Sequence, residues 1–316
     1  MKILANDGIA QSGIKALENA GFEVLTTTVA QEQLQNFINE NEITGLLVRG
    51  ATQVRKDLID NCPSLRLVGR GGVGMDNIDV EYAEKKGLFV INTPEASSSS
   101  VAELVFAHLF GGVRYLHDAN RNMPLEGDSN FKKLKKSYGS GTELRGKTLG
   151  IIGFGRIGQA TAKIALGIGM KVIYHDPYLE NTSLEVSFFD GQSVTFNFES
   201  QAKEELVSTS DFITLHVPAQ KNYILGKEEF ELMKPGVGII NAARGGVLDE
   251  VALVDALENG NVIFAGLDVY ESEPKPEIRI LMHPNISLTP HIGAATAEAQ
   301  NRIGMELAEQ IITLLK

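Results

Sequence analysis

The sequence contains a single cysteine, Cys62, and no tryptophan among its 316 residues. One thiol excludes an intrachain disulfide, which suits a reducing compartment. No apolar run reaches the roughly 18 residues that a membrane span needs. The first ten residues, MKILANDGIA, lack the apolar core of a secretory signal. We therefore expect a cytoplasmic protein without a membrane segment.

Positive charge is also scarce, because 29 basic residues face 40 acidic ones and the formal net charge is −11. A non-specific nucleic-acid binder would show a basic footprint, so a nucleic-acid partner is not expected. No two histidines have a spacing typical of metal ligands, and no metal is expected. Most of the six histidines are interpreted as structural: His108, His117, His175, His216 and His283.

The chain is long enough for two domains, and its 43% hydrophobic and 22% charged residues fit a globular protein. Short apolar runs alternate with segments of helical spacing over the first hundred residues. The runs are KILAND, EVLTTT, GLLVRG, RLVGRG and LFVINTP. This alternation predicts a parallel sheet with helices on both faces.

A second alternating series begins at Lys147. Its apolar runs are TLGIIGFG, KVIYHD, DFITLHVP, GIINAAR and IFAGLDVY. Between the two series, Ser100 and Glu103 have capping-box spacing and predict the start of a long helix. Residues 124–147 are polar and predict a surface connection with at most a short helix, in which KKLKK is a solvated face. Residues 186–198 predict a small hairpin, and residues 297–316 predict a final helix.

Gly153, Gly155 and Gly158 form a G-x-G-x-x-G motif that follows an apolar strand and opens a helix. The first glycine allows a tight turn, the second a close approach of the backbone to a pyrophosphate, and the third the packing of helix on strand. Asp176 lies 23 residues after Gly153, at the end of the next strand. Its carboxylate would accept hydrogen bonds from a ribose and repel a 2′-phosphate. The context therefore predicts binding of NAD rather than NADP.

Three later stretches, NAARGGVLDE, LDVYESEP and LTPHIGAAT, each follow an apolar strand and carry a polar residue that packing does not explain. These residues are Arg244, Glu273 and His291. Ligands of open α/β sheets lie at the carboxyl ends of strands, so the three side chains are expected to converge. Arginine can hold a carboxylate by two bonds, and histidine beside glutamate can move a proton. Together with NAD, the set indicates hydride transfer at C2 of a 2-hydroxy acid.

The motifs GIIGFGRIG, DFITLHVP, NAARGGVLDE, GLDVYESEP and TPHIGAAT resemble, in this order, those of the D-2-hydroxyacid dehydrogenase family. The resemblance implies an α/β protein with two doubly wound parallel-sheet domains, a Rossmann domain inserted into a flavodoxin-like one. The substrate-binding domain would comprise residues 1–97 and 295–316, and the NAD-binding domain residues 98–294. The family also implies an active site between the domains and a homodimer formed through the NAD-binding domains.

The resemblance assigns roles by position. Arg244 would bind the substrate carboxylate, His291 would be the acid/base, and Glu273 its partner. The implied NAD contacts are Val73, Gly153, Gly155, Arg156, Ile157, Gly158, Asp176, Pro177, Val217, Pro218, Ala242, Ala243, Asp268 and Gly293.

The segments VRGATQV, GRGGVGMDNID and NTPEASSSSVAEL resemble those of the 3-phosphoglycerate dehydrogenase branch of the family. This implies substrate contacts from Arg49, Arg70, Gly72 and Ser97, beside Arg244 and His291, with the arginines facing a phosphate. The branch implies oxidation of 3-phospho-D-glycerate in serine biosynthesis, here as a short form without a C-terminal regulatory domain. Two alternatives stay open: a glyoxylate/hydroxypyruvate reductase or another D-2-hydroxyacid dehydrogenase, and a corepressor-like protein that senses NADH.

Overall fold

The computed structural model describes all 316 residues. Its internal contacts divide the chain into two compact units, described separately below. The first, called unit 1, comprises Met1–Ser100 and Ala294–Lys316, and the second, unit 2, comprises Val101–Gly293. None of the helices combines the length and apolar character required to cross a membrane.

Unit 1 is built on a five-stranded parallel sheet with the order β2-β1-β3-β4-β5. The strands are β1 (Lys2–Ala5), β2 (Glu23–Leu25), β3 (Ile43–Val48), β4 (Leu67–Arg70) and β5 (Phe89–Asn92). All five coincide with the predicted apolar runs. This order is that of flavodoxin-like sheets, in which ligands lie at the carboxyl ends of strands beside the switch point.

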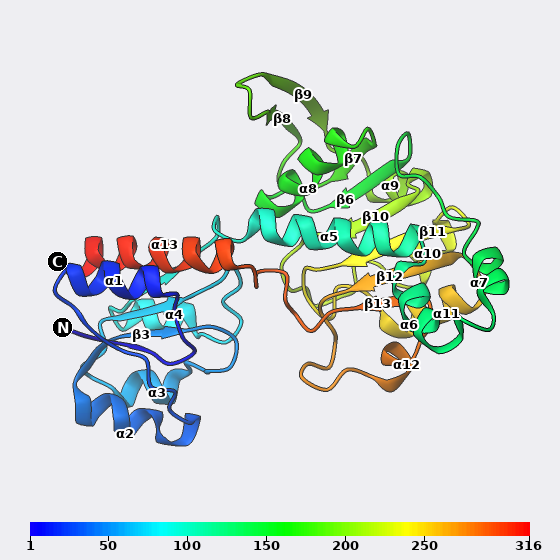
Figure 1. Cartoon of the computed structure of the whole chain (residues 1–316). Helices are drawn as coiled ribbons and strands as arrows, with labels where there is room; N and C mark the ends of the chain where they lie inside the picture. The colour runs from blue at the N-terminus through cyan, green and yellow to red at the C-terminus, as the bar shows by residue number, and fades with distance from the viewer. The chain divides into compact units, whose positions relative to one another are not determined.

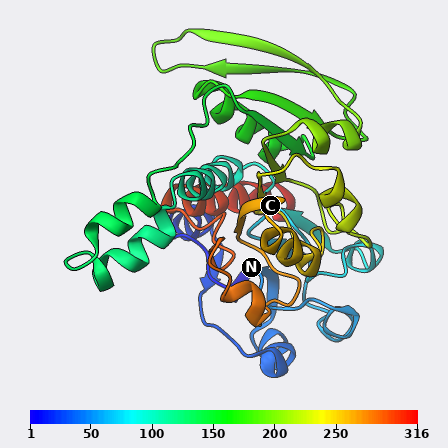
Figure 2. The ribbon, with the colours of Figure 1, turned by 90° about the vertical axis from the view of Figure 1, so that its right-hand side faces the viewer.

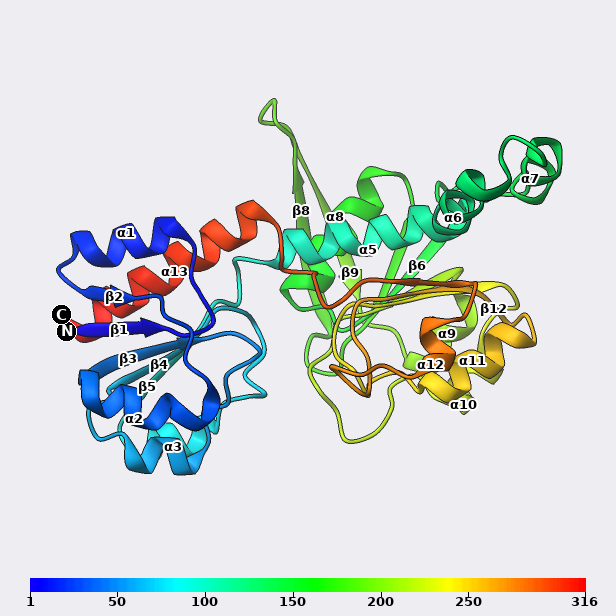
Figure 3. The ribbon, with the colours of Figure 1, turned by 60° about the horizontal axis from the view of Figure 1, so that its bottom comes forward.

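Helices cover both faces of this sheet, as Figure 3 shows. The helices are α1 (Gln11–Asn19), α2 (Gln31–Asn41), α3 (Lys56–Asn61), α4 (Val80–Lys85) and α13 (Ala297–Leu315). Consecutive strand residues point to opposite faces. Ile3 therefore packs with α1 and α13, and Leu4 with α2, α3 and α4. The predicted final helix joins the first hundred residues in one core.

Unit 2 contains a six-stranded sheet with the order β13-β12-β11-β10-β6-β7, and every pairing is parallel. The strands are β6 (Thr148–Ile152), β7 (Lys171–His175), β10 (Phe212–Leu215), β11 (Val237–Asn241), β12 (Val262–Leu267) and β13 (Ile286–Leu288). Ser200 continues the sheet beyond β7 through a parallel bridge to Tyr174. The strand order reverses between β6 and β10, where a doubly wound sheet binds its nucleotide.

The helices of unit 2 also lie on two faces. The first face carries α5 (Ser98–Val113) and α8 (Arg156–Gly167), which share a core with Phe154 and Tyr174. The other face carries α9 (Lys203–Thr209), α10 (Lys227–Leu232), α11 (Glu250–Glu258) and α12 (Ile278–Leu281). The predicted α/β class with two doubly wound parallel sheets is thus confirmed (Figure 1).

The predicted long helix forms, but it starts two residues before Ser100. α5 begins at Ser98, so Ser100 lies in its first turn, 4% exposed, and the predicted capping box is wrong. The helix then stops at Val113, because Tyr115 adopts a left-handed backbone with φ of 54°. Two further helices follow, α6 (Leu116–Glu126) and α7 (Phe131–Ser137). In α7 only Leu134 of KKLKK is buried, so the lysines form the predicted solvated face.

The predicted hairpin forms and is longer than expected, with β8 (Asn181–Ser187) paired to β9 (Ser193–Glu199). Figures 1 and 2 show it standing away from the six-stranded sheet. Leu184 pairs with Phe196 and Val186 with Val194, so one face is apolar. At the base of the hairpin, Phe198 packs on Phe154 and Tyr174. The hairpin is therefore anchored at the glycine-rich turn.

Candidate active site

The glycine-rich turn has the geometry that its sequence predicts. Gly153 adopts φ of +89°, and a Cβ there would lie 2.5 Å from the His216 carbonyl oxygen. Gly155 is the N-cap residue of α8, and a Cβ on it would meet no atom within 4 Å. No side chain caps this helix end, and Arg156 and Ile157 form its first turn. The turn thus offers an open cradle beside the amides of a helix N-terminus, a geometry suited to a pyrophosphate.

Asp176 follows β7 and faces the same turn. Its Oδ2 accepts a hydrogen bond from the Phe154 amide at 2.8 Å, and its Oδ1 accepts one from the Tyr178 amide at 2.9 Å. The Ser200 hydroxyl fixes its backbone, accepting from the Asp176 amide at 3.0 Å and donating to the Asp176 carbonyl at 3.1 Å. Each carboxylate oxygen can accept a second bond. The carboxylate is therefore held in place with capacity for two hydroxyl donors.

The other cofactor positions predicted in unit 2 lie on loops at the carboxyl ends of its strands. Pro177 follows Asp176, and Val217 and Pro218 follow β10. Ala242 and Ala243 follow β11, are 9% and 7% exposed, and link that strand to Arg244. These placements agree with a nucleotide lying along the strand ends.

Arg244 is held on a turn closed by Asn241. The Asn241 side-chain amide donates to the Arg244 carbonyl at 2.9 Å, while its oxygen accepts from the Ala243 amide at 3.1 Å. The Arg244 guanidinium donates to the Ala243 carbonyl at 2.6 Å. The next residue must be glycine, because a Cβ on Gly245 would lie 1.9 Å from the Tyr270 carbonyl oxygen. This contact brings the loops after β11 and β12 together.

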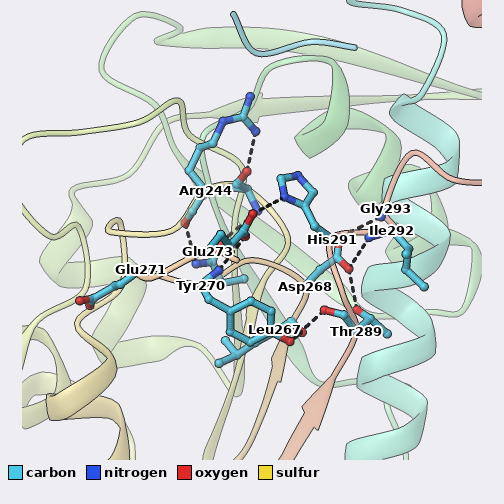
Figure 4. A network of polar contacts seen from close by, with 12 residues as sticks. Arg244, Leu267, Asp268, Tyr270, Glu271, Glu273, Thr289, His291, Ile292 and Gly293 are labelled. Atoms are coloured by element: carbon cyan, nitrogen blue, oxygen red, sulfur yellow. Dashed lines mark hydrogen bonds and ion pairs between the residues drawn. The ribbon is translucent and has the colours of Figure 1, made fainter. Parts of the chain in front are cut away.

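Glu273 and His291 form a direct pair, shown in Figure 4. His291 Nδ1 lies 2.9 Å from Glu273 Oε2, and the two side chains are 50% and 36% exposed. The second oxygen of Glu273 accepts from the Tyr270 amide at 3.0 Å. A carboxylate only accepts hydrogen bonds, so Nδ1 carries the proton and Nε2 remains as the acceptor in neutral histidine. The pair is therefore arranged to take or return a proton at Nε2.

Asp268 lies beneath this pair and is 1% exposed. Its carboxylate accepts from the Thr289 hydroxyl at 2.6 Å and from the Ile292 and Gly293 amides at 2.8 Å each. Tyr270 donates its hydroxyl to the carbonyls of Leu267 and Thr289, and burial raises the pKa of Tyr270 to about 12, which keeps this donor protonated. The loop that carries His291 is thus fastened to the loop after β12.

In unit 1, Arg49 and Arg70 lie at the ends of the neighbouring strands β3 and β4. Arg70 Nε donates to the Arg49 carbonyl at 2.9 Å, which joins the two loops. Asp7 follows β1 and accepts from the amides of Arg49 at 2.6 Å and Thr52 at 3.1 Å. The sequence reasoning missed Asp7. Asp7 lies two residues after an apolar strand, as Arg244 lies shortly after another, and this position was the available signal.

The remaining predicted positions of unit 1 differ in exposure. Val73 is 38% exposed and its carbonyl accepts from the Asn92 side chain at 2.7 Å. A Cβ on Gly72 would meet nothing within 4 Å. Ser97 is only 2% exposed, whereas Arg49 and Arg70 are partly exposed.

The histidines interpreted as structural are engaged inside the fold. His216 Nε2 lies 3.1 Å from the Thr214 hydroxyl, and burial lowers its pKa to about 3. His175 Nδ1 lies 2.8 Å from the Gln201 carbonyl, and His117 Nε2 lies 2.9 Å from the Pro284 carbonyl. Burial also lowers the pKa of His283. No three His, Cys, Asp or Glu side chains are arranged to hold a metal ion.

Comparison with known proteins identifies the family. Residues 106–293 match the family described as D-isomer specific 2-hydroxyacid dehydrogenase, NAD binding domain. The chain belongs to this family. The matched residues contain the glycine-rich turn, Asp176, Arg244, Glu273 and His291, so unit 2 is the family's NAD-binding domain.

Relatives of this dehydrogenase family member carry two different names. A D-3-phosphoglycerate dehydrogenase from Methanocaldococcus jannaschii is 41% identical over 318 residues, covering 100% of this chain and 58% of that enzyme. A hydroxypyruvate reductase from Thermotoga maritima is 42% identical over 316 residues, covering 98% and 97%. A crystal structure of a Thermus thermophilus protein has a TM-score of 0.85 at 29% identity, covering 100% and 97%. The predicted family and fold are confirmed.

Proposed function

We propose that the protein catalyses the NAD-dependent oxidation of 3-phospho-D-glycerate to 3-phosphohydroxypyruvate. The observation that carries this proposal is the pair of arginines, Arg49 and Arg70, joined at the ends of β3 and β4. A chain with a net charge of −11 repels a phosphorylated acid at long range, so a local cationic site must offset the overall charge. The name of the Methanocaldococcus jannaschii relative supports the same substrate.

The described residues of unit 2 fit NAD. The uncapped N-terminus of α8 and the open space at Gly155 would receive the pyrophosphate. The oriented carboxylate of Asp176 would accept the ribose hydroxyls. When bound, NAD supplies the ring that accepts a hydride from C2 of the hydroxy acid.

The side chains after β11, β12 and β13 perform the remaining chemistry. Arg244 presents a planar guanidinium that would hold the substrate carboxylate through two hydrogen bonds. His291 takes the hydroxyl proton at Nε2 during oxidation and returns it during reduction. Glu273 fixes the His291 tautomer through the 2.9 Å contact and stabilises the imidazolium that forms. Replacing a general acid typically costs about 10²–10⁴-fold in rate, so His291→Asn should lower kcat to that extent.

The deciding experiment compares kcat/KM for phosphohydroxypyruvate, hydroxypyruvate and glyoxylate with NADH in wild type, Arg49→Ala and Arg70→Ala. A charge-assisted hydrogen bond contributes about 1.5–3 kcal/mol, so each variant should lose roughly one to two decades on the phosphorylated acid. The decrease in kcat/KM should be much smaller with the unphosphorylated acids, because these have no phosphate for the arginines to bind.

Arg66→Ala is the matched control. Arg66 directly precedes β4, whereas Arg70 is its last residue. The control therefore removes the same charge at the other end of the same strand. We expect Arg66→Ala to leave the substrate preference unchanged. The phosphate site would be contradicted if the wild type preferred the unphosphorylated acids. It would also be contradicted if kcat/KM of the arginine variants fell equally with all three substrates.

The second candidate is a hydroxypyruvate reductase, favoured by the name of the Thermotoga maritima relative. It would use the same Arg244, Glu273 and His291, so it differs only in the role of unit 1. The substrate comparison above therefore separates the two. If the protein reduces none of the 2-oxo acids, both proposed activities are wrong. That result would favour a protein that binds NADH without turnover.

We also infer that the protein is a cytoplasmic homodimer formed through unit 2. The support is a set of large apolar side chains exposed along α5, α6 and α7: Phe110, Leu116, Met123, Leu125 and Phe131. Groups of exposed apolar side chains are typical of an interface with another protein. Sedimentation equilibrium should give twice the chain mass of 34.2 kDa, and a single-chain mass at micromolar concentration would contradict the dimer.

A further inference from the structure

We infer that His108 is a positioning residue for the loop that carries His291, acting through the Thr289 hydroxyl and the Asp268 carboxylate. His108 lies on α5, far in sequence from the three residues proposed to act on the substrate. The inference rests on the proposed function of His291 and concerns a residue that has no part in the proposed chemistry.

A chain of hydrogen bonds links His108 to the loop that carries His291. His108 Nε2 lies 3.1 Å from Thr289 Oγ1, and Thr289 Oγ1 lies 2.6 Å from Asp268 Oδ1. On the other side of the ring, His108 Nδ1 lies 2.9 Å from Ser287 Oγ. The ring thus bridges β13 and the loop that follows it.

The direction of each proton follows from the chemistry of the acceptor. The Asp268 carboxylate only accepts, so the single Thr289 hydroxyl proton is donated to it. Thr289 Oγ1 must then accept from His108 Nε2, which fixes the proton there. In the neutral ring, Nδ1 is consequently the acceptor for the Ser287 hydroxyl. Each of these hydrogen bonds therefore has one possible direction. Removing the Nε2 donor leaves Thr289 Oγ1 without the hydrogen bond that it accepts from His108.

Asp268 transmits this constraint to the backbone around His291. Its two oxygens accept the amides of Ile292 and Gly293, the residues that follow His291, as Figure 4 shows. His291 itself has φ of 54°, a left-handed conformation that a residue with a Cβ rarely adopts without support. The His291 amide also donates to the Thr289 carbonyl at 3.1 Å. The orientation of His291 therefore depends on where Thr289 and Asp268 are held.

The absence of a side chain at Gly266 makes room for the side chain at position 108. His108 is 3% exposed and lies against β12, where a Cβ on Gly266 would come within 2.6 Å of its own Cβ. Burial lowers the pKa of His108, with Asp268 acting to raise it and His117 to lower it, so the ring is neutral at physiological pH. A neutral ring with one donor and one acceptor is the state that the hydrogen-bond chain requires.

Two substitutions at the same position separate the positioning role from packing. His108→Gln places an amide donor near the position of Nε2 and can keep the bond to Thr289. His108→Asn reaches only the position of Nδ1 and keeps the bond to Ser287 alone. Both leave a neutral amide in the same helix, so comparable melting temperatures are expected for the two variants.

The first measurement is amide hydrogen exchange in the protein without substrate. Loss of one hydrogen bond should lower the protection of the Ile292 and Gly293 amides by about threefold to tenfold in His108→Asn, with wild-type protection restored in His108→Gln. The Leu253 amide, bonded to the Asp249 carbonyl in α11, serves as the internal reference. Equal loss in both variants, or no loss in either, would overturn the inference.

The second measurement is the kinetics of 2-oxo acid reduction with NADH. In His108→Asn we expect kcat to fall by about threefold to tenfold with KM for the acid unchanged, because Arg244 lies outside the chain. His108→Gln should restore kcat. A rise in KM without a fall in kcat would contradict a positioning role. If the wild type turns over no acid, the proposed function fails, while hydrogen exchange still decides whether His108 anchors the loop.

Discussion

Replacing Asp176 tests the cofactor site most directly, because its carboxylate is both a structural acceptor and the proposed ribose ligand. The structure shows Oδ2 bonded to the Phe154 amide and Oδ1 to the Tyr178 amide. Asp176→Asn keeps the side-chain shape and one oxygen but loses the charge and one acceptor. We expect this variant to fold and to shift its preference from NADH toward NADPH.

The size of the shift follows from two terms. Loss of one charge-assisted hydrogen bond to a ribose hydroxyl costs about 1.5–3 kcal/mol, or roughly one to two decades in kcat/KM for NADH. A carboxylate and a doubly charged 2′-phosphate about 5 Å apart repel by about 1.7 kcal/mol even at the dielectric constant of water. Removing that repulsion should raise kcat/KM for NADPH by about one decade. The ratio of the two efficiencies should therefore change by at least about 100-fold.

The assay measures kcat/KM for NADH and NADPH at saturating 2-oxo acid in both proteins. Asp190→Asn is the control, because Asp190 lies in the exposed turn between β8 and β9 and undergoes the same chemical change. The control should match wild type with both cofactors. A ratio in Asp176→Asn that stays within about threefold of wild type would refute the assignment of Asp176.

Two further predictions concern His216 and Arg244. The pKa of His216 is about 3 in the folded protein against an ordinary 6.5, so its contribution to stability is complete above pH 6.5 and is lost as pH falls. The free energy of unfolding should fall by about 1.4 kcal/mol per pH unit, or by roughly 2 kcal/mol at pH 5. Urea unfolding at pH 7.5 and pH 5 should show this decrease in wild type and not in His216→Gln. The same pH dependence in both proteins would contradict the buried neutral state. Arg244→Lys should lower kcat/KM for the acid by about tenfold or more, because an ammonium cannot grip a carboxylate at two points. Stopped-flow titration should show unchanged NADH affinity, and an equal loss of that affinity would indicate a structural fault instead.

The positions of Gly153, Asp176 and Arg244 could be predicted because each depends on local order along the chain. A strand followed by a turn puts its next residues at the carboxyl edge of a parallel sheet whatever the rest of the fold does. The observed strands β6, β7 and β11 end just before these residues, as expected. The same rule pointed to Glu273 and His291, which the structure brings to 2.9 Å.

Features that depend on tertiary packing could not be predicted in the same way. The stop of α5 at Val113 follows from the left-handed conformation of Tyr115, which nothing in the local sequence demands. Asp7 holds the Arg49 amide across 42 residues, and His108 meets Thr289 across 181. Partners at such separations have no fixed spacing, so a single sequence carries no pattern for them.

Gly245 combines a local turn after β11 with a close contact to the loop after β12. The loops after β11 and β12 approach so closely that any Cβ on Gly245 would overlap the Tyr270 carbonyl, and Tyr270 in turn donates its amide to Glu273. A displacement of Tyr270 therefore moves the carboxylate that fixes His291, while Arg244 lies on the displaced turn itself. Mispositioning of about 1 Å at reacting groups can cost about 100-fold in rate. We therefore expect a side chain at Gly245 to lower the rate by about 100-fold, by displacing the residues proposed to act on the substrate.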